Sequence, residues 1–177
     1  ITRLCNEVDK PLNFEMAATD EMLEIALGHT PHAACIVPEK REERTTEGGL
    51  DVVSGHNRLR PYIETLGKAG IRVSVFIEPD LAQLDGAKAV GAPVVELHVG
   101  AYCDATGAEQ ERQLARIVAA AAHAEKIGLE CHAGHGLTFD TVARVAVIPT
   151  IAELNIGHFL IGEAIFIGLE ESIRSMR

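Results

Sequence analysis

The chain has 177 residues with 16 Lys and Arg against 26 Asp and Glu, a formal net charge of −10. Its length supports one domain with a sizeable core. The acidic balance argues against nucleic acid or an anionic membrane surface as a partner, because both require a basic face. The apolar runs are shorter than the roughly 20 residues of a membrane helix, and no signal segment opens the chain.

Four cysteines, at positions 5, 35, 103 and 131, lie far apart and form no CxxC pair. This spacing in a chain without a signal segment is typical of reduced thiols in a cytoplasmic protein, not of a disulfide framework. We therefore expect a cytoplasmic location.

Short apolar runs alternate with longer stretches of helical spacing along the whole chain. In chain order we predict strand 12–16, helix 20–27, strand 33–37, helix 54–68, strand 71–77, helix 80–90, strand 93–99, helix 107–127, strand 129–133, helix 139–147, strand 152–156 and a last helix ending at 176–177. Thr19 has the position of a helix cap, and Gly70, Gly91 and Gly128 stand where helices should end. No linker or change of composition divides the chain, so residues 1–177 are predicted to form a single domain.

Strict β-α alternation predicts a parallel sheet, which can be an open doubly wound sheet or a closed barrel. Several predicted strands alternate polar and apolar residues, as where Glu96 and His98 share a face opposite Leu97. This favours a TIM (β/α)8 barrel, in which one face of each strand looks into the interior. A complete barrel has eight strands in roughly 250 residues. Since six are visible, we expect the first two βα units to be absent, so that the chain runs from strand 3 to helix 8.

Two carboxylates fall on the predicted interior face at strand ends, where barrel active sites are built. Glu15 follows Asn13 in the first visible strand, and Glu96 lies two residues before His98. A buried carboxylate needs a partner or a raised pKa, and the latter suits a general base near neutral pH. The alternative for each carboxylate is a structural ion pair. For His98 we favour a hydrogen-bonded interior histidine.

Further candidates lie in the two last strand-to-helix turns. His132 ends a predicted strand, and His135 follows between Gly134 and Gly136, where it could move protons at neutral pH or be a plain surface histidine. Gly136 and Gly157 stand in consecutive turns, the position at which barrels commonly bind phosphate through backbone N–H groups.

The polar stretch 38–50 is too long for a simple connection, which favours a functional loop over a solvated charge run. Glu15, Glu96, His98, His132 and His135 could also form a divalent metal site, but their spacing is not diagnostic. Signatures of acyl transfer, of a P-loop and of dinucleotide binding are absent.

Six motifs together resemble the pyridoxine 5′-phosphate synthase family and occur in that family's order. They are 13–17 (NFEMA), 37–41 (VPEKR), 45–51 (TTEGGLD), 96–98 (ELH), 133–137 (AGHGL) and 154–158 (LNIGH). The family's first strand carries an Asn-Ile-Asp-His-type motif, and its second strand ends in a His-x-Arg segment that holds another catalytic histidine. Neither stands in this sequence, which fits the expectation that two βα units are absent.

The resemblance implies condensation of 3-amino-2-oxopropyl phosphate with 1-deoxy-D-xylulose 5-phosphate to pyridoxine 5′-phosphate, phosphate and water. It implies that Glu15 accepts a proton, His135 donates one and Glu96 stabilises charged intermediates. It also implies that Thr45, Gly136, Gly157 and His158 contact substrate, the last three around phosphate.

The resemblance further implies that the protein needs no metal or organic cofactor and assembles as a homo-octamer. The proton transfers of this reaction require a site shielded from water, and the 38–51 loop is the natural shield. Two other functions stay open. One is a non-catalytic phosphate-binding barrel module, and the other is a metal-dependent aldolase or epimerase on the same scaffold.

Overall fold

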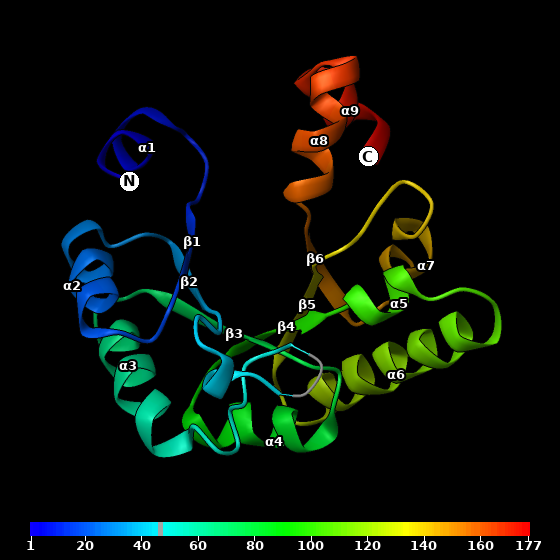
Figure 1. The fold of residues 1–177 in the computed structure, drawn as a ribbon. Coiled ribbons are helices and arrows are strands. Elements are labelled where there is room, and N and C mark those ends of the chain that lie inside the picture. The colour runs from blue at the N-terminus through cyan, green and yellow to red at the C-terminus, as the bar shows by residue number, and fades with distance from the viewer. Residues whose placement is uncertain (46–47) are drawn as a thin grey trace.

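A computed structural model of the chain describes residues 1–45 and 48–177 (Figure 1). The strands are β1 (Asn13–Met16), β2 (Ala33–Ile36), β3 (Arg72–Ile77), β4 (Val94–His98), β5 (Glu130–Gly134) and β6 (Ile151–Asn155). The helices are α1 (Thr2–Glu7), α2 (Asp20–His29), α3 (His56–Lys68), α4 (Leu81–Val90), α5 (Gly100–Asp104), α6 (Gly107–Lys126), α7 (Val142–Ala146), α8 (His158–Ile167) and α9 (Leu169–Met176), with a 3-10 turn η1 (Arg41–Glu43). The predicted strands are confirmed to within about one residue at most ends.

The strands form one parallel sheet in the order β1-β2-β3-β4-β5-β6, so that each strand pairs with its neighbours in the chain. A doubly wound sheet reverses its strand order at a switch point, and this sheet does not. Sequential winding is the topology of a TIM barrel. It confirms the predicted class of fold.

The sheet is curled into a half-barrel, and contacts of Glu96 show the curvature. Glu96 on β4 touches Cys35 on β2 and Asn155 on β6, which are each two strands away. Two strand spacings in a flat sheet amount to about 9.6 Å, so these short contacts require a concave interior face. β1 and β6 are the outer strands.

Helix ends follow the predicted capping chemistry. The Thr19 side chain accepts a hydrogen bond from the backbone N–H of Met22 at the start of α2, and Asp80 caps α4 in the same way. Gly91 ends α4 with a φ of 89°, in the left-handed region that glycine adopts without steric cost. These local signals therefore fix where the crossover helices begin and end.

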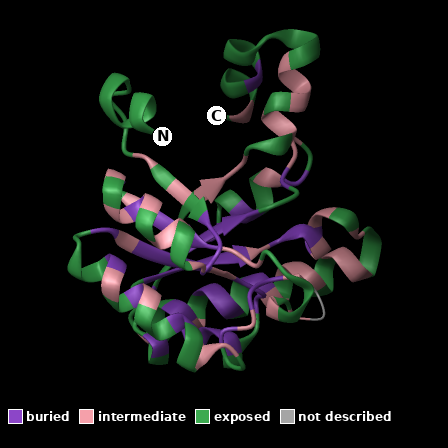
Figure 2. Cartoon of the chain, turned by 60° about the vertical axis from the view of Figure 1, so that its left-hand side comes forward, coloured by how far each residue is buried: buried purple, intermediate pink, exposed green. Residues whose placement is uncertain are grey.

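The core lies between the outward face of the sheet and helices α3, α4 and α6 (Figures 1 and 2). Val73, Val75, Val95 and Leu97 of the strands are buried against Leu59, Leu66, Leu84 and Ile117 of the helices. Figure 2 shows mostly exposed and intermediate residues in the helices next to both termini. Burial of branched apolar residues on this outer face leaves the inner face free for polar side chains.

Some elements differ from the prediction. The last helix is two helices, because Gly168 has a φ of 86° and breaks the α-helical path between α8 and α9. The helix predicted over 139–147 is confined to α7, and α1, α5 and η1 were not predicted because each is too short to show periodicity. In residues 1–45 and 48–177, no helix is long and apolar enough to cross a bilayer.

Candidate active site

Glu96 is a buried carboxylate near the carboxyl ends of the strands. It is 4% exposed, and its Oε2 accepts a hydrogen bond of 2.8 Å from Asn155 and a longer one of 3.6 Å from the Cys35 thiol. Burial raises the pKa of Glu96 to about 7, with a further contribution from the charge of Glu15, while the hydrogen bonds from Asn155 and Cys35 oppose the rise. A carboxyl with this pKa can gain and lose a proton near neutral pH.

Gly134 makes room for this carboxylate. A Cβ at Gly134 would lie 2.2 Å from Oε1 of Glu96, so a larger residue there would displace the side chain. Asn155 is one of the polar residues that the sequence predicted at the strand ends, whereas Cys35 and Gly134 were not predicted as site residues. The alternation of residues along the interior face of β2 and β5 is the signal that could have found Cys35 and Gly134.

Glu15 stands on the outer strand β1, in register with Cys35, and its charge acts on Glu96. The prediction that Glu15 is buried is wrong for this structure, because the residue is exposed. β1 has a neighbour on one side only, and that leaves its inward side chain open to solvent. The charge of Glu15 nevertheless raises the pKa of Glu96, because a nearby like charge disfavours the ionised form.

His135 has a backbone φ of 74°, which is unusual for a residue other than glycine. Gly134 and Gly136 flank it, and Gly136 also has a positive φ of 86°. A Cβ at Gly136 would lie 3.2 Å from the Cβ of Cys103 and 3.3 Å from the Cα of Gly100. The tight turn after β5 therefore holds the imidazole of His135 over the start of α5.

The ring of His135 rests beside the ring of His98, with 4.7 Å between the ring centroids. The pKa of His135 is lowered by partial desolvation and by the charge of His98. His98 is an interior histidine with a side chain that is 11% exposed, but the hydrogen bond predicted for it is not formed at Nδ1. Its Nδ1 lies 3.0 Å from Oε1 of Glu78, a residue that sequence reasoning missed. Glu78 directly follows β3, a strand-end position that was a usable signal.

The loop over 38–51 is attached to the end of β3. The backbone N–H of Gly49 donates to Oε1 of Glu78 over 3.0 Å, and that of Leu50 donates to the carbonyl of Phe76 over 2.7 Å. Thr45 closes the loop on itself, because its Oγ1 accepts from Gly48 and donates to the carbonyl of Gly49. The second hydroxyl and the acid of the TTEGGLD motif, at 46 and 47, lie outside the described residues.

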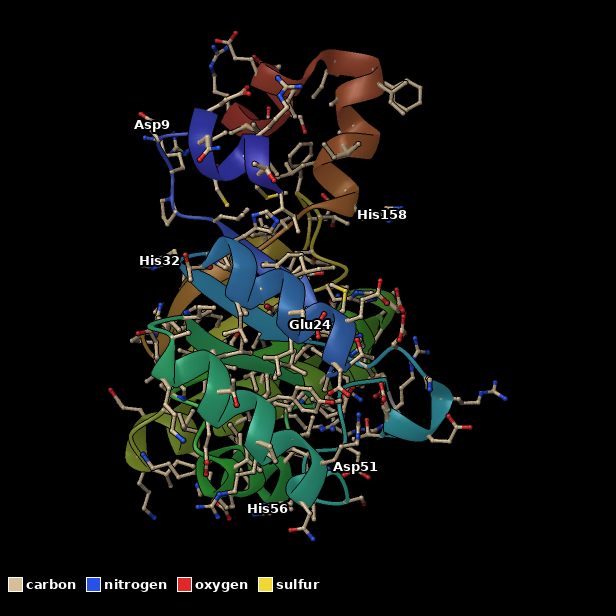
Figure 3. All side chains as sticks on the ribbon, turned by 90° about the vertical axis from the view of Figure 1, so that its left-hand side faces the viewer. Asp9, Glu24, His32, Asp51, His56 and His158 are labelled. Atoms are coloured by element: carbon tan, nitrogen blue, oxygen red, sulfur yellow. The ribbon has the colours of Figure 1, made fainter. Side chains whose placement is uncertain are left out.

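Gly157 and His158 stand at the start of α8 and are exposed (Figure 3 labels His158). The rings of Phe139 and Phe159 meet edge to face at 4.8 Å, which joins the segment after β5 to the first turn of α8. The first N–H groups of a helix have no partner within it and are suited to an anion. The segments that follow β5 and β6 are thus in contact, and the phosphate site predicted at their glycine turns stays a prediction.

His132 does not join this site, contrary to the prediction. It lies in the middle of β5, 4% exposed, with Nε2 at 2.8 Å from Glu130, and Glu130 also pairs with Arg72. These residues lie toward the amino ends of the strands. A cavity of about 100 Å³ at that end is lined by Pro11, Asn13, His32, Ala33, Arg72, Ser74, Val94, His132 and Glu153. Among the described residues, no cluster of three or more His, Cys, Asp or Glu is arranged to hold a metal ion.

Sequence comparison identifies the relatives of the chain. Residues 1–177 match the family model of the pyridoxal phosphate biosynthesis protein PdxJ. The chain is 71% identical over 178 residues to a pyridoxine 5′-phosphate synthase of Rhodospirillum rubrum, covering 100% of this chain and 72% of the relative. It is 60% identical over 181 residues to the synthase of that name from a Jannaschia species, covering 100% of this chain and 73% of the relative.

Solved structures show the same fold at low identity. A xylose isomerase domain protein from Planctomyces limnophilus matches with a TM-score of 0.57 and 15% identity, covering 94% of this chain and 71% of that one. An HpcH/Hpal aldolase/citrate lyase family protein from Burkholderia cenocepacia matches with a TM-score of 0.56 and 14% identity, covering 98% and 77%. At such identity the likeness concerns the fold alone.

Proposed function

Because the chain belongs to the family of the pyridoxal phosphate biosynthesis protein PdxJ, we propose that it catalyses the pyridoxine 5′-phosphate synthase reaction. In that reaction 3-amino-2-oxopropyl phosphate and 1-deoxy-D-xylulose 5-phosphate condense to pyridoxine 5′-phosphate, phosphate and water. The observation that carries the proposal is 71% identity over the whole chain to a synthase of this name. The polar side chains at the carboxyl ends of the strands supply groups suited to the acid and base steps.

Glu15 and Glu96 take different roles in this proposal. Glu96 has a pKa raised to about 7 and is held by Asn155 and Cys35, so it stabilises positive charge on an intermediate when ionised. Glu15, exposed on β1, is open to substrate and takes the role of proton acceptor. Imine formation and ring closure both need a base of this kind.

His135 is the proton donor in this proposal. Its position in a tight turn, with a φ of 74°, presents the ring at the mouth of the half-barrel. Since the lowered pKa makes the imidazolium a stronger acid, His135 gives up its proton readily once it has been protonated. Departure of water from the condensing substrates requires such a donor.

The phosphate groups bind at the two glycine turns and the start of α8. Gly136, Gly157 and His158 supply backbone N–H groups and an imidazole, and Thr45 reaches the substrate from the loop docked on β3. The overall charge of −10 does not oppose this, because backbone donors bind the anion locally. The 38–51 loop shields the reaction from water.

We further propose that the protein works in the cytoplasm as a homo-octamer without added metal or organic cofactor. The chain spans about 72% of the length of its relatives. Two βα units preceding β1 would close the barrel, because one added strand would pair with β1 and the other with β6. Sedimentation velocity of the intact protein tests the octamer, and a dimer or monomer at working concentration would contradict it.

The test of the reaction is an assay for pyridoxine 5′-phosphate with both phosphorylated substrates, with and without a chelator. We expect product in both conditions, and a loss of about two orders of magnitude or more in turnover for Glu96→Gln. Substrate binding without turnover would support the phosphate-binding module instead. Activity that a chelator abolishes and a divalent ion restores would support the metal-dependent alternative.

A further inference from the structure

We propose that Glu78 and His98 are positioning residues for His135: the Glu78 carboxylate holds the ring of His98, against which the ring of His135 rests, and ties this pair of rings to the 38–51 loop. This inference rests on the proposed role of His135 as proton donor. The proposed reaction gives neither Glu78 nor His98 a part of its own.

The side chains of Glu78 and His98 are in close contact and largely shielded from solvent. Oε1 of Glu78 lies 3.0 Å from Nδ1 of His98, and the two side chains are 4% and 11% exposed. Nδ1 of His98 does not meet the geometry of a hydrogen bond with this oxygen, so the two side chains form an ion pair only when the imidazole is protonated.

The rings of His98 and His135 are held together from several sides. Their centroids are 4.7 Å apart with an interplanar angle of 35°, and Phe76 lies edge-on to His98 at 5.1 Å. A Cβ at Gly100 would lie 3.0 Å from Cε1 of His98 and 3.1 Å from Cδ2 of His135. Glycine at position 100 thus lets both rings settle over the start of α5.

Glu78 also connects the rings to the loop. The same Oε1 that lies near His98 accepts the backbone N–H of Gly49. A Cβ at Gly49 would lie 2.4 Å from the backbone nitrogen of Glu78, so the loop approaches β3 as closely as a glycine allows. Docking of the loop and placement of the imidazole pair therefore depend on one carboxylate.

The charge state of His135 responds to the groups that face it. They are His98 on β4, Asp104 on α5, His158 on α8 and Glu15 on β1. The charges of His98 and His158 lower the pKa of His135, whereas those of Asp104 and Glu15 raise it. Desolvation lowers the pKa of His135 most, and His98 has the largest effect among these neighbours, in the same direction.

The first test follows the imidazole of His135 by NMR titration of the intact protein labelled at its histidines. Its resonance is assigned as the one lost in His135→Asn. We expect the titration midpoint of the His135 imidazole to move to higher pH in His98→Gln, because the charge of His98 that lowers the pKa of His135 is removed. The matched control is His123→Gln, since His123 also pairs with a carboxylate, Asp85, at 2.8 Å but far along the chain on α6.

An unchanged His135 midpoint in His98→Gln, or an equal shift in the His123→Gln control, would overturn the role of His98. This readout needs no turnover. Failure of the wild-type protein to make product would therefore count against the proposed function and leave the coupling of the two rings intact.

The second test concerns Glu78, through the nuclear Overhauser contact between the ring protons of His98 and His135. Glu78→Leu removes both acceptor and charge, so we expect this contact to be lost, and trypsin to cut faster at Arg41 and Arg44 in the freed loop. Glu78→Gln keeps an acceptor for Gly49 and should retain the loop's protection from trypsin. In an active enzyme Glu78→Leu should raise KM for a phosphorylated substrate about tenfold, the cost of one hydrogen bond to a charged group. A retained ring contact and unchanged proteolysis in Glu78→Leu would overturn the proposal for Glu78.

Discussion

Asn155 on β6 donates a hydrogen bond of 2.8 Å to Oε2 of Glu96 on β4, across the interior face of the intervening strand β5. This hydrogen bond connects β6 to the side chain of Glu96, which has a pKa of about 7. Because Asn155 favours the ionised form of Glu96 while burial disfavours it, protonation of this one group depends on the curvature of the whole sheet.

Glu96→Gln should make the protein more stable at high pH. The folded pKa of Glu96 lies above its unfolded value, so its contribution to stability is full below pH 4.5 and is lost as the pH rises through about 7. A glutamine side chain stays neutral at every pH, so the variant does not lose this stability as the pH rises. We expect its free energy of unfolding at pH 8.5 to be higher than that of the wild-type protein by about 1 to 3 kcal/mol. Urea unfolding of both proteins at pH 5 and pH 8.5 measures it. If the variant and the wild-type protein differed in free energy of unfolding by the same amount at both pH values, the raised pKa of Glu96 would not be the cause.

His135→Asn should leave the fold intact and lower turnover by about two to four orders of magnitude. Asparagine tolerates the left-handed backbone that a φ of 74° requires, so the turn after β5 should persist. Circular dichroism and thermal unfolding provide the control for folding, and steady-state kinetics give the effect. Near-normal turnover in a folded His135→Asn protein would rule out His135 as the proton donor.

Gly136→Ala should destabilise the protein, whereas Gly157→Ala should not. At Gly136 the φ of 86° and a Cβ position 3.2 Å from Cys103 both oppose a side chain, which costs on the order of 1 to 3 kcal/mol. At Gly157 the φ is −115°, and no atom lies within 4 Å of the position that a methyl group would take. Thermal unfolding of the two variants side by side makes the comparison, and an equal loss would show that the turn after β5 tolerates a side chain.

Gly49→Ala should release the 38–51 loop from β3. A methyl group there would lie 2.4 Å from the nitrogen of Glu78 and 2.7 Å from the carbonyl carbon of Ile77, which are backbone atoms that cannot move aside cheaply. We expect tryptic cleavage at Arg41 and Arg44 to accelerate, with little change in far-UV circular dichroism, because the helices and the sheet do not depend on this loop. Gly67→Ala, on α3 with open space around it, is the control.

The sequence by itself determined the order of strands and helices, the parallel sheet and most of the residues at the mouth of the half-barrel. The alternation in β4 placed Glu96 and His98 on one face, and glycines around His135 predicted a tight turn. These features are local, since side-chain direction in a strand repeats every two residues and positive φ selects glycine. Family motifs then added roles that no local pattern contains.

Only the tertiary structure decided which of the interior polar groups meet. His132 lies two residues before Gly134 and therefore on the same face of β5. It is nevertheless deeper in the sheet, where it contacts Glu130 and lies away from the site. Glu15 is exposed because β1 is an outer strand, and Glu78 reaches His98 because β3 and β4 are neighbours. A strand's periodicity gives the face of a side chain, whereas its depth, its solvent exposure and its partners depend on how neighbouring strands are aligned and how far the sheet curls.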